Sequence, residues 1–223
     1  MCSSDLLQLA NIVPIFKKGQ KKDMGNYRPV SLTCQGCKIM EKIIKEEIVK
    51  FLEENLKIGN SQHGFRCKRS CLTNLLEFSE RLLEQADNND PVDVLFFDLQ
   101  KAFDKVPHGR LLYKLHRIGI RGNVLGWIEE WLRGRKQRVV LNGIASDWIE
   151  VTSGVPQGSV LGPVLFIVYI NDIEGEIINR FWKFADDSKM MGNVSSWAGV
   201  DLIRSDLEKL VEWTKKNRRC RSM

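Results

Sequence analysis

The chain has 223 residues, of which 43% are hydrophobic, so it is long enough to bury a sizeable core as one large domain or two closely packed lobes. Its 34 basic and 28 acidic residues give a net charge of +6 and an isoelectric point near 9.0, a balance that suits a polyanionic partner. This composition excludes a disordered chain, and the longest apolar run, Val160 to Ile170, is too short to cross a bilayer.

Two amphipathic helices are predicted in the first ninety residues. Apolar residues recur at helical spacing from Ile39 to Leu52 and again from Leu72 to Leu83. Turn-forming residues from Asn88 to Pro91 then precede a run of strand formers, Val94 to Phe97, which is typical of a buried central strand. Asp98 follows directly, so a carboxylate is expected where this strand ends.

The next part of the chain is expected to contain helices and a hairpin. Helical patterns cover 111–118 and 124–132. A hairpin is predicted from 138 to 151, because Asn142-Gly143 is a favoured two-residue turn between strands. A further helix is expected at 159–173.

A second hairpin is expected around Asp186-Asp187. Strand-like runs at 181–184 and 189–191 flank this pair, which places both residues at the hairpin tip. A last helix is predicted from 200 to 216. Since the elements do not alternate as regular βαβ units, the pattern indicates an α+β fold in which helices pack on one face of an antiparallel sheet.

The carboxylates of Asp98, Asp186 and Asp187 each follow an apolar strand. If the two strands are neighbours, these groups converge and repel one another unless a divalent cation neutralises them. Oxygen ligands at an open position suit Mg²⁺, which takes one or two carboxylates together with water and substrate phosphates. Two such ions about 4 Å apart could activate a hydroxyl and stabilise a leaving pyrophosphate. Taken singly, Asp98 could be a helix cap and Asp186-Asp187 an ordinary turn.

Five motifs resemble those of reverse transcriptases from non-LTR retrotransposons of the LINE class, and most of all those of jockey-like elements. The matching segments are 97–104 (FDLQKAFD), 184–187 (FADD), 154–163 (GVPQGSVLGP), 26–32 (NYRPVSL) and 62–66 (QHGFR). The first two resemble the catalytic motifs, the third the nucleotide-pocket motif, and the last two signatures of the fingers. Their order and spacing agree over nearly the whole chain, which makes the resemblance specific where one motif alone would be weak.

This resemblance implies the fingers and palm of a right-hand polymerase fold. It also implies the activity of an RNA-directed DNA polymerase, a nucleotidyltransferase that joins dNTPs to a DNA primer on an RNA template. Two Mg²⁺ ions are implied as cofactors, and Mn²⁺ can substitute for them. By the same resemblance Asp98 and Asp186 are the main metal ligands, Asp187 lies nearby, and the backbone carbonyl of Leu99 is an extra ligand.

The resemblance also assigns residues to the incoming nucleotide. Phe103 corresponds to an aromatic gate that crowds a ribose 2′-hydroxyl, and ordinary core packing is the alternative. Arg28 corresponds to the fingers residue that holds the triphosphate, a task that suits a bidentate guanidinium. Gln157 and Gly158 match the pocket that faces the nucleotide, where a glycine allows the backbone to approach closely.

Nucleic-acid contacts are predicted for Arg66, Arg135 and Lys136. The last two lie near tryptophans that could stack on a template base, although core packing is favoured for Trp127, Trp131 and Trp213. Asp104 is expected to be structural, and Lys17 and Lys18 to be solvated surface charges. His63 and His108 have no predicted role.

The six cysteines are expected to be free thiols, since no segment resembles a secretory signal peptide. We expect an intracellular protein, nuclear or cytoplasmic, without a membrane partner. Cys34 with Cys37, and Cys67 with Cys71, have the spacing of a four-thiolate zinc site, and the alternative is that they are small apolar side chains. The sequence leaves both readings open and does not predict an oligomeric state.

The reverse transcriptase domain is expected to span 14–217, without the thumb and the endonuclease that non-LTR elements usually carry. Its expected parts are 1–90 (mainly fingers), 91–116 (palm), 117–152 (a fingers and palm insertion), 153–217 (palm) and 218–223 (an unrelated tail). Two alternatives stay open. One is a catalytically inactive retrotransposon relic or nucleic-acid-binding module, and the other is a different palm polymerase, such as a group II intron maturase or a telomerase.

Overall fold

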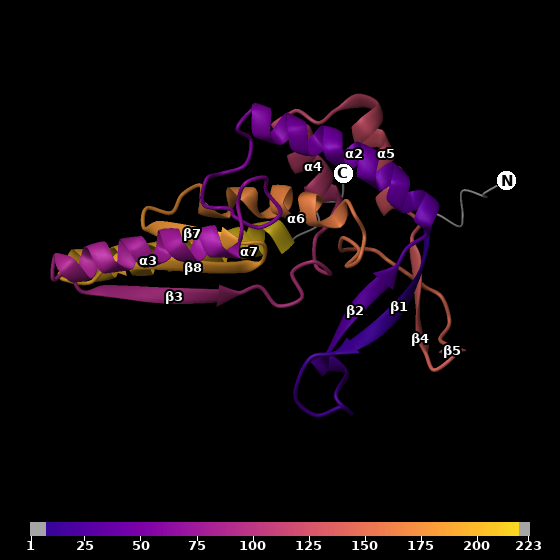
Figure 1. Cartoon of the computed structure of the whole chain (residues 1–223), viewed down its shortest axis with the longest axis horizontal. Coiled ribbons are helices and arrows are strands. Elements are labelled where there is room, and N and C mark those ends of the chain that lie inside the picture. Colours follow the sequence, from indigo (N-terminus) through magenta and orange to yellow (C-terminus); the bar gives the residue numbers. More distant parts are fainter. Residues whose placement is uncertain (1–7, 219–223) are drawn as a thin grey trace.

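The computed structural model describes residues 8–218, which form two β-sheets and the helices around them (Figure 1). The larger sheet has the strand order β2-β1-β4-β5, with β6 also paired to β4. Its strands are β1 (Leu9–Phe16), β2 (Tyr27–Leu32), β4 (Lys136–Leu141), β5 (Ile144–Ala145) and β6 (Ile149–Glu150). The three-stranded sheet has the order β3-β8-β7, with β3 (Val92–Asp98), β7 (Arg180–Phe184) and β8 (Asp187–Asn193).

The helices lie close to where the sequence predicts them, so the mixed α+β class is confirmed. They are α2 (Gln35–Glu54), α3 (Cys71–Asp87), α4 (His108–Ile118), α5 (Gly122–Leu132), α6 (Gly162–Ile170) and α7 (Trp197–Arg218), with short 3-10 turns η1 (Met24–Asn26) and η2 (Asn171–Glu174). Helix α6 is shorter than expected and apolar on all sides, so it is buried as the central helix of the core.

The larger sheet contains two strands that the sequence patterns do not predict, β1 and β2. Both contain a proline, which lacks the backbone N–H that a strand uses for pairing and therefore argues against a strand. Pro14 and Pro29 face each other in the β1–β2 register, and Pro14 lies beyond the part of β1 that pairs with β4. The sheet therefore places its prolines where each needs few partners.

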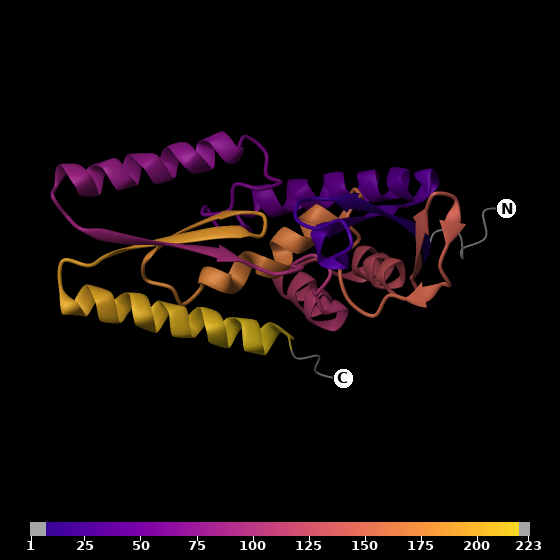
Figure 2. The same ribbon diagram turned by 90° about the horizontal axis from the view of Figure 1, so that it is seen from below.

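The three-stranded sheet is covered on both faces, whereas helices on one face only were expected. Helix α3 lies on one side of the sheet and α7 on the other (Figure 2). Phe78 of α3 packs edge-on against Trp182 of β7, with ring centroids 5.4 Å apart. On the opposite face, Ile203 of α7 lies so close to Gly192 of β8 that an added Cβ would be 2.5 Å away. Helices thus pack on both faces of the sheet, and its ends stay open to solvent and ligands.

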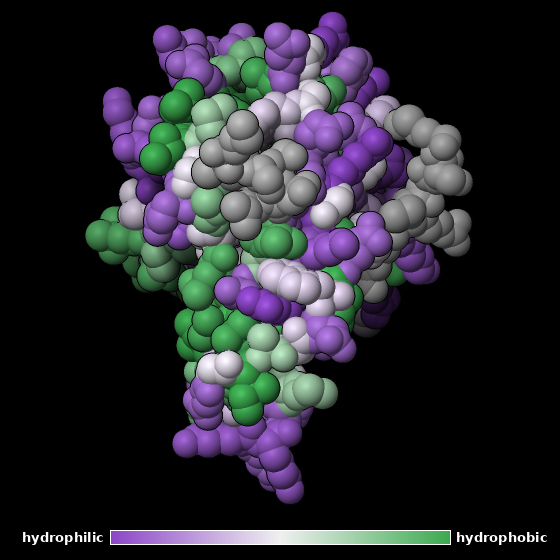
Figure 3. All heavy atoms as spheres, turned by 90° about the vertical axis from the view of Figure 1, so that its right-hand side faces the viewer, coloured by the Kyte–Doolittle hydropathy of each residue, from purple (hydrophilic) through white to green (hydrophobic). Residues whose placement is uncertain are grey.

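The side of the molecule that carries β4 and β5 has apolar side chains gathered above a hydrophilic tip (Figure 3). Exposed apolar residues of β4, β5 and β6 include Leu141, Ile144 and Ile149, respectively. The outer part of the larger sheet is therefore open to solvent. In residues 8–218 no helix has both the length and the apolar character that crossing a membrane requires.

Lys114 of α4 joins three helical elements at the base of the core. Its Nζ donates hydrogen bonds to the Tyr169 carbonyl oxygen and to Asp172 Oδ1, both at 2.6 Å, and lies 4.7 Å from the centre of the Trp213 ring. Trp213 of α7 donates to the same Asp172 oxygen at 2.9 Å. Burial lowers the pKa of Lys114 to about 8 in spite of the Asp172 charge.

Replacing Lys114 by methionine should flatten the pH dependence of stability in alkaline solution. The pKa of Lys114 is about 8 in the folded chain and 10.5 in the unfolded chain. Between these two values only the unfolded chain keeps the proton on Lys114. The free energy of unfolding therefore increases as pH rises from about 8 to 10.5. At about 1.36 kcal/mol per pKa unit the gain is about 3 kcal/mol at most. Urea unfolding at pH 7.5 and pH 10 should show this gain in the parent and in exposed Lys105→Met, and not in Lys114→Met. Equal gains in all three would contradict the assignment.

Candidate active site

The pairing of β3 with β8 brings three carboxylates to one edge of the sheet. Asp98, the last residue of β3, is the register partner of Asp187, the first residue of β8. Asp187 in turn faces Phe184 of β7, so Asp186 belongs to the two-residue turn between β7 and β8. The strands are neighbours, as the sequence analysis assumed. Of the acidic pair, however, only Asp186 lies in the turn.

The turn has a backbone conformation that few residues adopt. Ala185, its first residue, has a φ of 56°, in the left-handed region where an L side chain is disfavoured. Such strain persists only where surrounding contacts hold the backbone in place. The structure around Ala185 must therefore supply those contacts.

The electrostatics of the site favour a cation. Burial raises the pKa of Asp186 above its ordinary value, and the charges of Asp187 and Asp98 raise it further. The positive charge of Arg28, an exposed residue of β2, acts in the opposite direction. Asp98 and Asp187 are exposed to solvent. The three carboxylates therefore interact unfavourably with one another, at a position that ions and substrates can reach.

The donor atoms at this edge fit Mg²⁺ bound together with a substrate. In the described part of the chain, no group of three or more His, Cys, Asp or Glu side chains is arranged to hold a metal ion by itself. Mg²⁺ does not require such a group, since it takes one or two carboxylates and completes its shell with water and phosphates. Asp98 and Asp186 supply oxygen donors of this kind. Cys34, Cys37, Cys67 and Cys71 likewise do not come together as such a group.

The cysteines instead have local roles. Cys37 is buried, its Sγ lies 3.3 Å from Glu41 Oε1, and burial raises its pKa to about 11. A thiol with a raised pKa is a poor thiolate ligand. Cys67 and Cys71 are exposed and free, and Cys34 is half-buried. Small apolar packing is thus the better description of Cys37, as the alternative reading proposed.

A segment from the first half of the chain braces the strand that leads into the turn. Residues 61–64 run beside β7, with a parallel bridge between Gln62 and Lys183. The Lys183 N–H donates to the Ser61 carbonyl oxygen at 2.8 Å, and the His63 N–H donates to the Lys183 carbonyl oxygen at 2.9 Å. Asn74 of α3 donates its side-chain amide to that same carbonyl at 3.2 Å. Strand β7 is therefore held on its outer edge by backbone pairing.

The Gln62 side chain holds the turn itself. It is 1% exposed, and its Oε1 accepts hydrogen bonds from the Ala185 N–H at 3.0 Å and the Gly64 N–H at 2.8 Å. Gly64 lies so close to the turn that an added Cβ would be 2.5 Å from the Ala185 nitrogen. These contacts account for the left-handed backbone at Ala185. The motif at 62–66 is visible in the sequence, but the sequence predicts no role for Gln62.

The loop that contains Gln157 and Gly158 joins the two halves of the fold. Gln157 donates its side-chain amide to Asp104 Oδ1 at 3.0 Å, and its carbonyl accepts from the Ser31 N–H at 2.6 Å. Gly158 has a φ of 107°, and an added Cβ would lie 2.6 Å from the Ser31 carbonyl oxygen. Gly158 therefore makes the close backbone approach expected of it, but to β2. Asp104 has the structural role predicted for it.

Phe103 and Leu99 lie between the carboxylates and the core. The Phe103 ring stacks on Phe166 of α6 with centroids 4.3 Å apart, and the side chain is half-buried. Leu99 is also half-buried and packs against the same core. Phe103 thus has the packing contact that was the alternative to a gate, while part of it remains accessible.

Two of the three residues predicted to contact nucleic acid have neighbours within the protein that the sequence did not indicate, and the contact itself stays a prediction. Arg66 is 7% exposed and forms a two-pronged pair with Glu53, with N–O distances of 3.0 and 2.6 Å. Arg135 is 3% exposed and lies 5.1 Å from the centre of the Trp131 ring. Lys136 is exposed, as a surface contact requires. Sequence spacing thus does not reveal the side chains that lie beside a guanidinium group in the fold.

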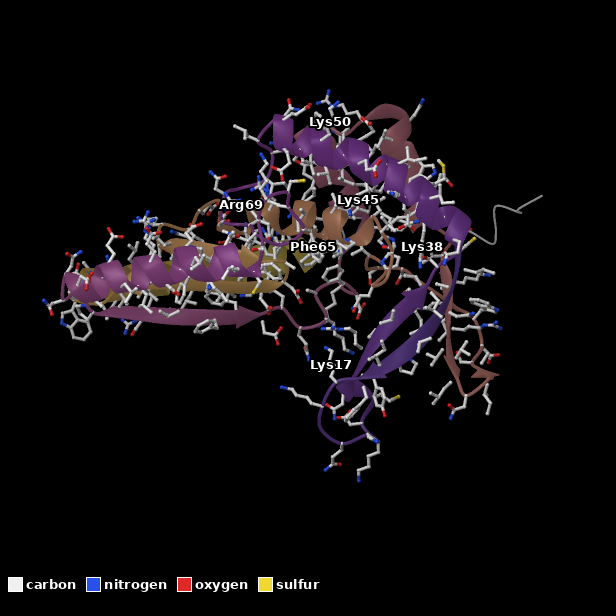
Figure 4. The ribbon with its side chains drawn as sticks, viewed as in Figure 1. Lys17, Lys38, Lys45, Lys50, Phe65 and Arg69 are labelled. Atoms are coloured by element: carbon white, nitrogen blue, oxygen red, sulfur yellow. The ribbon has the colours of Figure 1, made fainter. Side chains whose placement is uncertain are left out.

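Other basic and aromatic residues lie at the surface beside the turn of Asp186. Lys38, Lys45 and Lys50 lie along α2, and Phe65 lies below them between the two sheets (Figure 4). Phe65 is 49% exposed and follows Gly64, which touches the turn that carries Asp186. Lys17 lies at the end of β1 on the facing side. Lysines spaced seven and five residues apart on one predicted helix were the available sequence signal.

The remaining aromatic and histidine residues are structural. Trp131 is buried and Trp127 stacks on it, so the core packing favoured for them is confirmed. His63 Nδ1 lies 2.8 Å from Thr73 Oγ1, and His108 Nε2 lies 2.8 Å from the Gly154 carbonyl oxygen. Both histidines therefore have partners that the sequence did not indicate.

The chain matches the family model described as reverse transcriptase (RNA-dependent DNA polymerase) over residues 17–219. Among curated proteins, it is 32% identical over 186 residues to a probable RNA-directed DNA polymerase from transposon X-element of Drosophila melanogaster, covering 81% of this chain and 20% of that protein. It is 31% identical over 219 residues to the RNA-directed DNA polymerase from mobile element jockey of Drosophila funebris, covering 93% of this chain and 24% of that protein. The chain thus spans about a fifth to a quarter of these relatives.

Solved structures show the same fold. An apo telomerase from Candida tropicalis superposes with a TM-score of 0.65 at 12% identity, covering 97% of this chain and 49% of that one. A telomerase from Candida albicans in complex with a fragment of telomeric RNA has the same TM-score and identity, covering 96% and 41%. The right-hand polymerase fold expected from the sequence is therefore confirmed.

Replacing Gln62 by alanine should loosen the turn that carries Asp186. The N–H groups of Ala185 and Gly64 would lose their shared acceptor, which typically costs about 1–3 kcal/mol for buried groups. Urea unfolding should show this loss relative to exposed Gln100→Ala, and hydrogen exchange of the Ala185 amide should become faster. A Gln62→Ala protein as stable as Gln100→Ala, with an unchanged Ala185 amide, would show that the brace is unnecessary.

Proposed function

The chain belongs to the reverse transcriptase family, and on this premise we propose that it forms the fingers and palm of a non-LTR retrotransposon polymerase that extends a DNA primer on an RNA template. The observation that carries the proposal is the position of the carboxylates. Asp98 and Asp187 face each other at the sheet edge, and Asp186 lies in the adjoining turn. Clustered carboxylates with open access are the arrangement that metal-assisted phosphoryl transfer needs.

The proposed reaction is nucleotidyl transfer from a dNTP to the primer. A bond forms between the primer 3′ oxygen and the α-phosphorus, and the bond from that phosphorus to the oxygen bridging to the β-phosphate breaks. Pyrophosphate leaves, and the proton of the 3′-hydroxyl passes to solvent. No oxidant or reductant is needed.

Asp98 and Asp186 are the residues proposed to hold the metal ions, with Asp187 and the Leu99 carbonyl beside them. When two Mg²⁺ ions are bound, they supply activation of the attacking hydroxyl and stabilisation of the leaving oxygen. Burial raises the pKa of Asp186, and repulsion by Asp187 and Asp98 raises it further, so a bound cation would stabilise the ionised carboxylates. Mn²⁺ accepts the same oxygen ligands and can substitute.

Arg28 is proposed to hold the triphosphate of the incoming nucleotide. It is exposed on β2, and its positive charge acts on the Asp186 carboxylate, which supports a place near the metal-bound phosphates. A planar guanidinium binds two phosphate oxygens at once. Gln157 and Gly158 are proposed to form the adjacent wall of the nucleotide pocket through the loop that they share.

Template and primer are proposed to lie across the surface that bears Phe65. Lys38, Lys45 and Lys50 of α2 supply positive charge for phosphates. Lys136 of β4 is exposed and is proposed as a separate phosphate contact on the larger sheet. Phe65, exposed beside the turn of Asp186, can stack on a base.

The two sheets support the division into fingers and palm expected from the sequence. We assign residues 1–90 mainly to fingers, 91–116 and 153–217 to palm, and 117–152 to the insertion between them. Strand β4 from the insertion pairs with β1 of the fingers, which fits this assignment. The expected tail, 218–223, lies outside the described residues except for Arg218 at the end of α7.

Replacing Asp186 by asparagine should abolish extension of oligo(dT) on poly(rA) and leave the fold intact. Loss of one charged ligand should lower the rate at least about a hundredfold, with Mg²⁺ or with Mn²⁺. The matched control is Asp93→Asn, which removes an exposed carboxylate from the far end of β3 and should keep full activity. Extension by Asp186→Asn at the parent rate would end the metal assignment. Absence of extension by the folded parent would favour a catalytically inactive relic or a nucleic-acid-binding module.

Replacing Phe103 by valine should admit ribonucleotides if its ring is the gate. The smaller side chain gives a 2′-hydroxyl room, so the ratio of rNTP to dNTP incorporation should rise by about tenfold or more. This ratio is insensitive to loss of stability from the broken stacking with Phe166, since both substrates meet the same protein. Exposed Phe96→Val is the control. An unchanged ratio would leave Phe103 with core packing alone.

A further inference from the structure

A cavity of about 420 Å³ lies between the larger sheet and the loop 149–157, apart from the three carboxylates. Ala10 and Ser31 form part of its floor, and their small side chains leave the space open. Asp98, Asp186 and Asp187 do not line it. Of the residues assigned to the incoming nucleotide only Gln157 borders it, and the Gln157 side-chain amide is already bound to Asp104. The cavity is therefore distinct from the proposed metal site, and its size suits a small ligand.

Positive charge dominates the lining of this cavity. Four cations border it, Lys101, Arg135, Lys136 and Arg138, against two carboxylates, Asp104 and Glu150. Within the described residues none of the four cations forms an ion pair with a carboxylate. Such an excess is unfavourable in a concave, partly desolvated space unless an anion enters it.

Arg135 carries the strongest signal, because its charge is buried without a hydrogen-bonded partner. The side chain is 3% exposed, and its Nη1 has no hydrogen-bond acceptor among the described residues. The negative charge of Glu41 acts on Arg135, but this carboxylate already accepts hydrogen bonds from other groups. Glu41 Oε2 accepts from the Val160 and Leu161 N–H groups at 2.6 and 3.1 Å. Buried polar groups of proteins are almost always satisfied, so this orphan indicates a missing acceptor.

Arg138 offers a second guanidinium at the same cavity. Its Nε donates to Asn11 Oδ1 at 2.9 Å, and its Cζ lies 4.5 Å from the centre of the Trp148 ring. These contacts fix the stem and orientation of the group while they leave its terminal nitrogens without a carboxylate. Two oriented guanidinium groups and two lysines match the oxygens of a phosphate better than any neutral ligand.

We propose that this cavity binds the phosphate group of a nucleotide or of a nucleic-acid strand, held by Arg135, Arg138 and Lys101. The net excess of two positive charges is balanced by one phosphate dianion. The hydroxyl of Ser31 lines the same space as a further donor. That a strand supplies the phosphate rests on the proposed function, whereas the anion site itself does not.

The test is calorimetric titration of the full chain, without metal, by inorganic phosphate, by AMP and by a short single-stranded oligoribonucleotide. Arg138→Gln and Lys101→Gln should each weaken phosphate-dependent binding about tenfold, because each removes a charge-assisted contact. The matched controls are Arg133→Gln and Lys105→Gln, which make the same charge changes at exposed positions outside the cavity and should stay within about twofold of the parent.

The three probes identify the source of the phosphate. If Arg138→Gln and Lys101→Gln lose affinity equally for inorganic phosphate and AMP, the cavity is a site for small anions. If they lose affinity only for the oligoribonucleotide, the phosphate belongs to a strand. Circular dichroism of each variant shows that it is folded. Asp186→Asn should bind all three probes like the parent, so failure of the proposed polymerase activity leaves this test intact. The proposal is overturned if Arg138→Gln and Lys101→Gln bind like their controls, or if the folded parent binds none of the probes.

Discussion

The register between β3 and β8 is the constraint on which the rest of the structure depends. Side chains alternate between the two faces of a strand, so a slip of one residue would turn Asp98 away from Asp187 and expose the buried face of the sheet. The register is held from both faces. Phe97 stacks on Phe181 over the core, with centroids 5.9 Å apart, and α3 and α7 close the two sides. The unfavourable proximity of the acids is therefore a consequence of packing elsewhere.

The strained turn at Ala185 shows how the fold keeps these acids in place. Neither β7 nor β8 supplies the acceptor for the Ala185 N–H, which comes from Gln62 across the boundary between the two halves. Behind it, Lys183 is fully buried and pairs with Glu174 at 2.9 Å, and Glu174 also accepts from the Ser61 hydroxyl at 2.6 Å. The part of the chain that we assign to the fingers thus shapes the turn of Asp186 directly, and the two parts cannot be adjusted independently.

Sequence reasoning succeeded where the pattern is local. The apolar runs of β3 and β7 and the periodicity of α2 and α3 identified those elements, because both signals come from residues close together in the chain. The buried central position expected of β3 was wrong, since β3 is an edge strand without a fully buried residue and Phe96 is 75% exposed. It missed β1 and β2, whose facing prolines hide a sheet that only pairing over distance creates. It did not predict the role of Gln62, because the hydrogen bond from the Ala185 N–H joins residues 123 positions apart. It did not indicate the neighbours of Arg66 and Arg135 for the same reason, since spacing shows a charge but not whether a carboxylate or a ring lies beside it.

The central claim is that Asp98 and the Asp186 turn form one cation site, and iron-directed cleavage of the backbone tests it most directly. Fe²⁺ takes oxygen ligands and, with ascorbate and peroxide, cuts the chain where it is bound. We expect cuts near residue 98 and near residues 186–187 in the same protein, both suppressed by excess Mg²⁺ and both lost in Asp186→Asn. Cleavage at only one of these segments, or at positions away from both, would show that the paired strands do not build a shared site.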